Sequence, residues 1–153
     1  MIMDTTVRRI TEFDKDLIAL LFVQAREDQN IDPNIKFFNY SNNILLVAYK
    51  GEIPAGFLYA YILSGLKTPY PKLFLYSIDV FSDSQRQNIA TKLINELKNI
   101  AFINDCSEIF VLTNKSNKAA MSLYQKTSGN IVNNDDVLFV YDREIFLKNE
   151  NIS

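Results

Sequence analysis

The chain has 153 residues and a formal net charge of −2 at pH 7, from 16 basic and 18 acidic side chains. Hydrophobic residues make up 48% of it, so we expect one globular domain over residues 1–153 with a sizeable core. No basic cluster is present to follow a phosphate backbone, and the apolar runs are far shorter than the roughly 20 residues of a membrane span. These features argue against nucleic acid and membrane as partners. Residues 1–10 lack a signal-like apolar core, which favours a cytoplasmic location.

The chain contains no histidine and one cysteine, Cys106. The absence of histidine removes the usual general base and the commonest zinc ligand. Triad hydrolases and histidine-ligated metalloenzymes are therefore excluded, and we expect no metal. Cys106 has no partner for an internal disulfide, and we interpret it as a small residue at a helix end.

Hydrophobic periodicity divides the chain into strands and helices. In chain order it predicts strands at 6–10, 44–49, 53–62, 72–80, 108–112, 131–132 and 137–147, with helices at 12–24, 35–40, 89–102 and 118–126. Thr11 is the expected N-cap of the first helix, and the Lys50-Gly51 turn predicts an antiparallel hairpin. The order is β-α-α-β-β-β-α-β-α-β-β. The fold class is therefore α/β with a mixed, mainly antiparallel sheet.

The turn after the strand at 72–80 is the first candidate site. It reads Gln85-Arg86-Gln87-Asn88-Ile89-Ala90 and opens the helix at 89–102. A helix N-terminus has unpaired N–H groups and a partial positive charge, and Arg86 adds a permanent cation. The turn is therefore either an anion site for a cofactor pyrophosphate or an ordinary strand-to-helix connection. The spacing alone favours neither.

Residues 85–90 resemble the acyl-CoA-binding signature Q/R-x-x-G-x-G/A of the GNAT N-acetyltransferase superfamily. Residues 117–124 resemble a second family motif, N-x-x-A-x-x-x-Y, on the next helix. Asn88 stands where the signature has glycine, although asparagine tolerates left-handed backbone. Ser128 also replaces a common glycine, so we expect the exit from that helix to be displaced by one residue. The resemblance implies the GNAT acyl-CoA N-acyltransferase fold over nearly the whole chain, with acetyl-CoA as cofactor.

The resemblance also implies roles for single residues. Tyr124 would protonate the leaving thiolate, which its ordinary pKa near 10 allows, whereas outside this motif a helix tyrosine usually packs in a core. Backbone N–H groups where residues 78–80 splay from the neighbouring strand would stabilise the oxyanion. The implied cofactor-binding residues are Ile78, Val80, Gln85, Arg86, Gln87, Asn88, Ile89, Ala90 and Asn117.

The general base has no clear sequence signal. Strand alternation puts Asp79 on one face with Ser77, opposite Tyr76, near the expected acetyl group. Asp79 is thus a candidate base and substrate-binding residue, with a strand-end acid or turn cap as an equal alternative. Four further acids would gather a cationic substrate at the cleft mouth, unless they are ordinary surface residues. These acids are Glu27, Asp28, Asp135 and Asp136.

The predicted function is direct acetyl transfer from acetyl-CoA to a primary amine of a small molecule. Within the superfamily the chain looks most like the aminoglycoside 3-N-acetyltransferase-like group, so an aminoglycoside 3-N-acetyltransferase of antibiotic resistance is one alternative. Lys115 and Lys118 would repel such a polycation. A non-catalytic acyl-CoA-binding module and a protein N-terminal acetyltransferase are the others. Many relatives dimerise through C-terminal strands, and the apolar residues 137–141 either form a homodimer or pack in the chain's own core.

Overall fold

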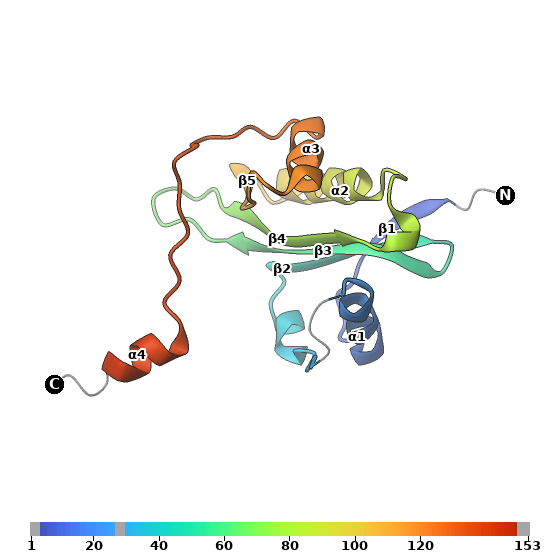
Figure 1. The fold of residues 1–153 in the computed structure, drawn as a ribbon, viewed down its shortest axis with the longest axis horizontal. Coiled ribbons are helices and arrows are strands. Elements are labelled where there is room, and N and C mark those ends of the chain that lie inside the picture. The colour runs from blue at the N-terminus through green and yellow to red at the C-terminus, as the bar shows by residue number, and fades with distance from the viewer. Residues whose placement is uncertain (1–3, 27–29, 150–153) are drawn as a thin grey trace.

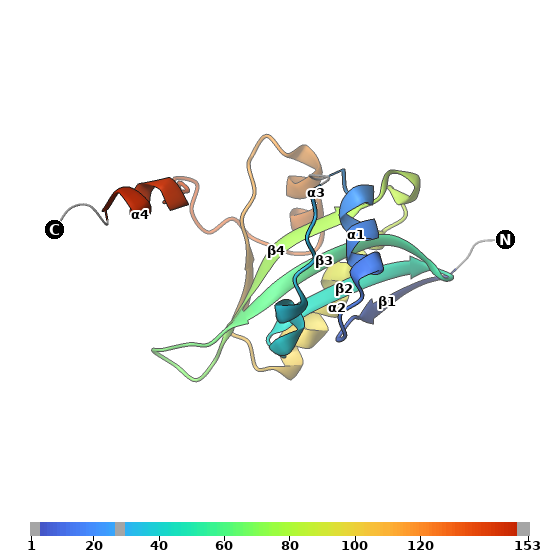
Figure 2. The same ribbon diagram turned by 90° about the horizontal axis from the view of Figure 1, so that it is seen from below.

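The computed structural model describes residues 4–26 and 30–149. Its elements are β1 (Thr5–Arg9), α1 (Lys15–Gln24), η1 (Ile35–Asn39), β2 (Asn43–Lys50), β3 (Ile53–Leu63), β4 (Lys72–Val80), η2 (Ser82–Ser84), α2 (Ile89–Ile103), β5 (Glu108–Val111), α3 (Lys118–Lys126) and α4 (Arg143–Asn149). The strands form one sheet, with α2 and α3 on one face and α1 and η1 on the other (Figure 1). Figure 2 shows the second face from below, with α1 lying across it. Within the described ranges no helix has the length and apolar character that crossing a membrane requires.

The sheet is mixed and mainly antiparallel, as predicted. Strands β1 to β4 pair antiparallel in chain order, and β5 joins β4 in parallel. The predicted hairpin of β2 and β3 is confirmed. The α/β fold class predicted from the sequence is therefore confirmed.

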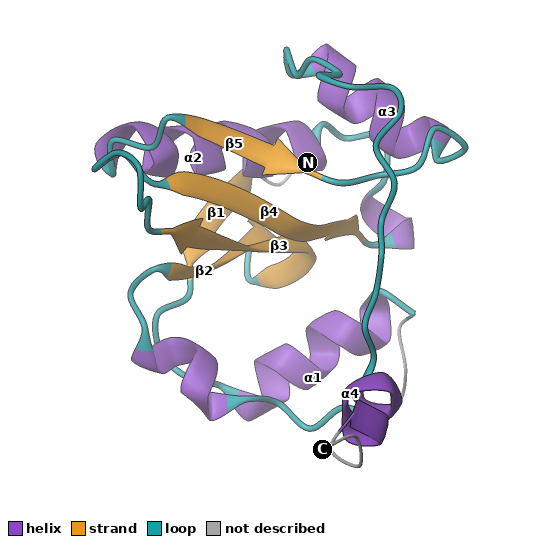
Figure 3. Cartoon of the chain, turned by 90° about the vertical axis from the view of Figure 1, so that its left-hand side faces the viewer, coloured by secondary structure: helices purple, strands orange, loops and turns teal. Residues whose placement is uncertain are grey.

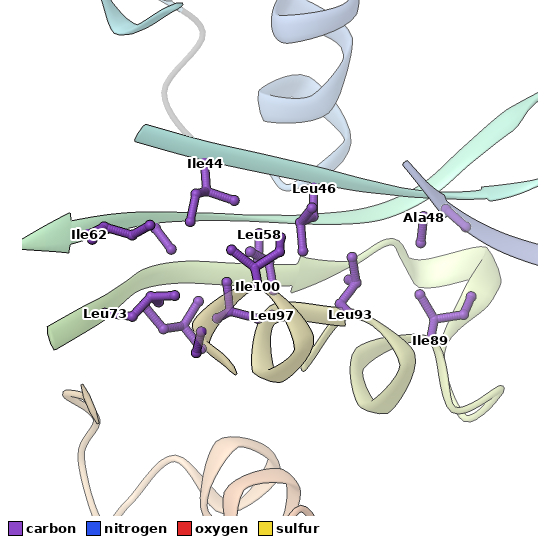
Figure 4. Close-up of a cluster of buried hydrophobic side chains, with 14 residues drawn as sticks. Ile44, Leu46, Ala48, Leu58, Ile62, Leu73, Ile89, Leu93, Leu97 and Ile100 are labelled. Atoms are coloured by element: carbon purple, nitrogen blue, oxygen red, sulfur yellow. The ribbon is translucent and has the colours of Figure 1, made fainter. Parts of the chain in front are cut away.

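The face toward α2 is packed with aliphatic side chains. Alternate residues of the strands meet residues of α2 that recur at helical spacing, as Figure 4 shows for Leu46, Leu58, Leu93 and Leu97. All four are 0% exposed. Complete burial of a leucine contributes about 1.5–3 kcal/mol each to folding, so this face is the main source of stability.

The face toward α1 is built from aromatic side chains. Leu21 of α1 packs on Phe57 of β3, and Phe37 and Phe38 of η1 pack against the same cluster. Helix α1 begins where Asp14 accepts a hydrogen bond from the Leu17 backbone N–H at 3.1 Å. The prediction of Thr11 as the N-cap is therefore wrong. The N-cap is Asp14, three residues further along the chain, whose side chain pairs with a free N–H group of the first turn.

The predicted strands at 131–132 and 137–147 are wrong. Residues 130–142 form an extended arm that leaves α3 and ends in α4, apart from the sheet (Figures 1 and 3). The side chains of residues 137–141 are 71–77% exposed. An apolar run forms a strand only beside a pairing partner, and within the described residues the outer edge of β5 has none. Residues 143–149 are helical because Asp142 caps them, accepting from the Ile145 N–H at 3.1 Å.

Candidate active site

Strands β4 and β5 run together over only part of their length. Their pairing ends at Leu75 and Val111, whereas β4 continues to Val80. In the described part of the chain, no strand lies beside residues 76–80 on this side. This is the divergence that the family resemblance implied for residues 78–80. Ile78 and Val80 themselves point toward the aliphatic core and pack against it.

A bulge changes which β4 side chains share a face. Tyr59 of β3 pairs with Ser77, but the next residue, Ala60, pairs with Leu75, so Tyr76 is an extra residue on β4. Directly paired residues share a face, and the ring of Tyr76 stacks on Tyr59 with 5.1 Å between centroids. Tyr76 therefore lies on the same face as Ser77. The expectation that strict alternation separates them is wrong.

Asp79 lies on this aromatic face. It pairs with Phe57, whose ring belongs to the cluster under α1, and it is partly buried. Asp79 and Ser77 share this face, as the sequence predicted. An acid at the end of β4 is therefore directed toward the α1 side of the sheet.

The turn from β4 into α2 contains two residues in left-handed backbone. Asn88, the N-cap of α2, has φ 61° and ψ 20°, as expected of an asparagine at a glycine position. Arg86 has φ 64°, which the sequence did not predict. Such non-glycine residues cost about 1–3 kcal/mol each and persist only where the surroundings impose them. The turn is therefore held in a specific shape.

The side chains of this turn are divided between surface and core. Gln85, Arg86, Gln87 and Asn88 are exposed, whereas Ile89 is buried and Ala90 is partly buried. The Gln85 side chain donates from Nε2 to the Val80 carbonyl at 3.4 Å, which ties the turn to the end of β4. The exposed part of the turn is thus available to a ligand, and the buried side chain of Ile89 anchors the turn to the core.

A second cation reaches this turn from α3. Lys126 donates from Nζ to Oδ1 of Asn88 at 2.8 Å, so its charge lies beside the N-terminus of α2 with Arg86 nearby in sequence. Lys98 of α2 donates to the Thr127 carbonyl at 2.6 Å and fixes the two helices together. The sequence analysis missed Lys126. The only sequence signal for Lys126 was its position two residues after Tyr124, the last residue of the second motif.

Helix α3 carries Tyr124 and is capped at both ends. Asn117 caps its start by accepting from the Ala120 N–H at 3.1 Å. Tyr124 packs against the aliphatic core, and burial raises the pKa of its phenol. The helix therefore presents a tyrosine that stays protonated well above neutral pH.

The end of α3 is not displaced, contrary to expectation. Ser128 takes the left-handed position itself, with φ 74°. The Ser128 N–H donates to the Gln125 carbonyl at 3.1 Å and the Gly129 N–H to the Tyr124 carbonyl at 2.7 Å. These two bonds form a Schellman motif with serine where glycine is usual.

Of the other predicted substrate acids, the two that the structure describes, Asp135 and Asp136, do not lie at β4. Glu27 and Asp28 lie outside the described residues. Asp135 and Asp136 are exposed on the arm, where both bond to Asn133, through the Asp135 N–H at 2.9 Å and the Asp136 carboxylate at 2.8 Å. Among the described residues, only Asp79 of the predicted acids lies on the sheet.

A cavity that the sequence analysis missed lies between the sheet and the α1–η1 layer. Its volume is about 190 Å³. Phe57 and Tyr59, which pair with Asp79 and Ser77, form part of its wall. The alternation Phe57, Tyr59, Tyr61 along one strand was the available sequence signal. The lining residues are Ile18, Leu21, Phe22, Asn34, Phe37, Phe38, Leu45, Phe57, Tyr59 and Tyr61.

Three of the solved structures similar to this chain are aminoglycoside acetyltransferases. The aminoglycoside acetyltransferase meta-AAC0020 from an uncultured soil metagenomic sample, in complex with trehalose, is 26% identical, with a TM-score of 0.77 over 90% of this chain and 95% of that chain. The aminoglycoside acetyltransferase HMB0005, also from an uncultured soil metagenomic sample, is 22% identical, with a TM-score of 0.80 over 92% and 99%. Aminoglycoside N-acetyltransferase AAC(6')-Iy in complex with CoA is 17% identical, with a TM-score of 0.72 over 92% and 96%.

The sequence itself matches a family profile. The profile describes the acetyltransferase (GNAT) family and matches residues 14–129, which include the divergent end of β4, the α2 turn and α3. No curated protein matches the chain. Because the family match covers well over half of the sequence and includes these elements, the chain belongs to the acetyltransferase (GNAT) family.

Proposed function

We propose that this single domain is an acetyl-CoA-dependent N-acetyltransferase acting on a primary amine of a small molecule. The observation that carries the proposal is the contact between Lys126 and Asn88. It brings the helix bearing Tyr124 to the turn that family resemblance assigns to the cofactor pyrophosphate. The two motifs, separate in sequence, form one surface.

The residues of this surface fit the phosphate end of the cofactor. The first N–H groups of α2 carry a partial positive charge, and Arg86 and Lys126 add two full charges beside them. Acetyl-CoA supplies an activated acetyl thioester and, after transfer, the thiol as leaving group. Asn88 adopts the left-handed backbone that glycine provides in relatives, so the turn keeps the shape this role needs.

The proposal assigns a group of the chain to each chemical step. On the β5 side, residues 78–80 have no strand beside them in the described chain, and N–H groups on this edge would donate to the thioester oxygen as it gains negative charge. The amine nitrogen would form the new C–N bond as the C–S bond breaks, and Tyr124 would give its proton to the departing sulfur. The proton that the nitrogen loses on becoming an amide would restore the phenol. Its raised pKa keeps that proton in place at neutral pH.

Asp79 is the proposed acceptor of the proton that the substrate ammonium must lose. For an amine with a pKa near 10.4, this loss at pH 7 costs roughly 4–5 kcal/mol. Asp79 lies at the end of β4 on the aromatic face, beside the divergence from β5. Its carboxylate also attracts the cationic amine, so one residue would serve binding and deprotonation.

Aminoglycoside acetylation is the second candidate function. It is favoured by the 26% identity with meta-AAC0020, a protein also solved in complex with sisomicin. It is opposed by the exposed Lys115 and Lys118 near the start of α3, which would repel a polycation. Turnover across an aminoglycoside panel decides between a drug and another amine. A protein that binds acetyl-CoA but consumes none of it with any amine would be a binding module.

The first experiment is a calorimetric titration of the purified chain with acetyl-CoA. We expect a dissociation constant on the order of micromolar, in the usual range for enzyme substrates. Thiol release in the presence of amines then tests transfer. Failure of acetyl-CoA to bind would overturn the proposal, because every step depends on the α2 turn.

The proposal includes a homodimer formed through the arm. Residues 137–141 are 71–77% exposed, which is unusual for five consecutive large apolar residues. Light scattering should give twice the chain mass of 17.6 kDa. Phe139→Asp should give the monomer and keep acetyl-CoA binding. A wild-type protein at the monomer mass would contradict this part of the proposal.

A further inference from the structure

The cavity under α1 and η1 has the chemistry of a site for a flat apolar group. Of the described residues, those that line it are apolar or aromatic except Asn34, whose side chain is engaged in capping η1. Its volume is about 190 Å³. An engineered apolar cavity of about 150 Å³ stays dry and binds benzene, so this cavity is large enough for one six-membered ring.

The walls of the cavity are rings held in fixed orientations. Phe57 and Tyr59 lie nearly parallel, with 8° between their planes. Phe37 meets Tyr59 and Tyr61 edge-on, with centroids 6.5 Å and 5.9 Å apart. A guest ring therefore meets both faces and edges of its neighbours, the two contacts that aromatic pairs prefer.

The cavity is lined by the strand that pairs with the transfer end of β4. Phe57 and Tyr59 form part of its wall, and their direct partners on β4 are Asp79 and Ser77. Paired residues of antiparallel strands have Cβ atoms about 4.5–5.5 Å apart. A ring seated in the cavity therefore lies one strand away from Asp79, a separation that a short alkyl chain spans.

The described lining of the cavity is uncharged, which disfavours one class of amine. A polycationic sugar places several ammonium groups in its site and needs acids or water around each of them. Within the described residues no acidic side chain lines the cavity, and an ammonium buried there would lose its hydration without a partner. A substrate with one amine, held at Asp79, avoids that loss.

We propose that the acceptor is a monoamine with an aryl group, whose ring occupies the cavity and whose amine reaches Asp79. This inference rests on the proposed function and names its substrate class. The ring contributes binding through aromatic contacts, and the carboxylate receives the charged end.

The test compares 2-phenylethylamine with ethylamine and sisomicin as acceptors for the full chain with acetyl-CoA. The ring should raise kcat/KM at least about tenfold over ethylamine, since apolar contacts in a fitted pocket discriminate on this scale. Tyr61→Leu should remove most of that advantage by raising KM for 2-phenylethylamine, with a much smaller change in kcat/KM for ethylamine. Tyr70→Leu, which changes an exposed tyrosine outside the lining, is the matched control. Equal loss with both amines would indicate a structural role and overturn the inference.

A second measurement separates this inference from the proposed function. Amide chemical shifts of the protein without acetyl-CoA are recorded as 2-phenylethylamine is added. Ring-current shifts concentrated at Phe37, Phe57 and Tyr59, and weakened in Tyr61→Leu, support the ring site. If acetyl-CoA nevertheless fails to bind, the proposed function and the acceptor role fall together, while the binding site for the ring stands. Absence of such shifts overturns the inference. Acetyl-CoA binding with sisomicin as the preferred acceptor also overturns it and leaves the proposed function standing.

Discussion

The two faces of the sheet come from the same strands but are packed differently. Toward α2 the side chains are aliphatic, and Leu46, Leu58, Leu93 and Leu97 are all 0% exposed. Toward α1 they are aromatic and leave a cavity of about 190 Å³. Protein interiors are normally close-packed, so a cavity of this size distinguishes the α1 face from the core under α2. The difference indicates that one face stabilises the fold and the other is open to a ligand.

Stability mutants test whether the two faces differ in packing. Leu97→Ala removes a fully buried side chain of α2 and should lower the free energy of unfolding by about 2–5 kcal/mol. Tyr61→Leu, on the wall of the existing cavity, should lower it by only roughly 1 kcal/mol. Urea unfolding midpoints with unchanged slopes measure both. Similar losses would mean that the α1 face is packed as tightly as the other.

The chemistry is predicted to depend on a residue of the α2–α3 layer. Tyr124→Phe should lower kcat about a hundredfold or more, because it removes the proton donor to the thiolate. The dissociation constant for acetyl-CoA should stay the same. Unchanged kcat would remove Tyr124 from this role, and Tyr141→Phe on the exposed arm is the control.

The pH profile tests the same residue. Burial raises the pKa of Tyr124, so the donor stays protonated beyond the ordinary tyrosine value of about 10. The alkaline fall in wild-type kcat that belongs to this group should therefore lie above that pH and be absent in Tyr124→Phe. An alkaline fall near pH 8 that disappears in this variant would contradict the assignment.

The affinity for acetyl-CoA should depend on charged residues of the α2–α3 side and not on residues of the cavity. Arg86→Ala and Lys126→Ala should each raise the dissociation constant for acetyl-CoA about tenfold, because each removes a charge beside the helix N-terminus. The loss should shrink at high salt, since both side chains are exposed. Lys67→Ala in the β3–β4 loop and Tyr61→Leu in the cavity should leave binding unchanged. If the Arg86 and Lys126 variants bound acetyl-CoA with wild-type affinity, the phosphates would have to lie elsewhere.

Local signals in the sequence predicted the elements that surround the site. Strand β4 and helix α3 have the predicted bounds, because alternation and helical spacing are legible within each segment. The left-handed backbone of Asn88 followed from the chemistry of asparagine at a glycine position. Function-bearing turns are predictable when the residue type itself restricts the backbone.

The features that the sequence did not predict depend on which segments meet. The bulge at Tyr76 is a property of the register between β3 and β4, and one extra residue changes which side chains share a face. The bond from Lys126 to Asn88 joins residues far apart in the chain. Residues 137–141 show the pattern of a buried strand, but periodicity does not reveal what a segment pairs with. Asp142, by contrast, was a readable cap that the strand prediction overrode.

The smallest predicted effect concerns the end of α3, where the α2–α3 side holds Tyr124 in place. Ser128 has φ 74°, a conformation that costs a residue with a Cβ atom about 1–2 kcal/mol and glycine almost nothing. Glycine also gains freedom in the unfolded chain, so Ser128→Gly should raise the free energy of unfolding by only about 0.5–1 kcal/mol. Ser122→Gly inside the same helix is the matched control and should lower it by roughly 0.5 kcal/mol. Opposite signs for the two serines would establish that the Schellman motif fixes this helix end, and a loss at both would mean that the Ser128 side chain contributes more than its backbone costs.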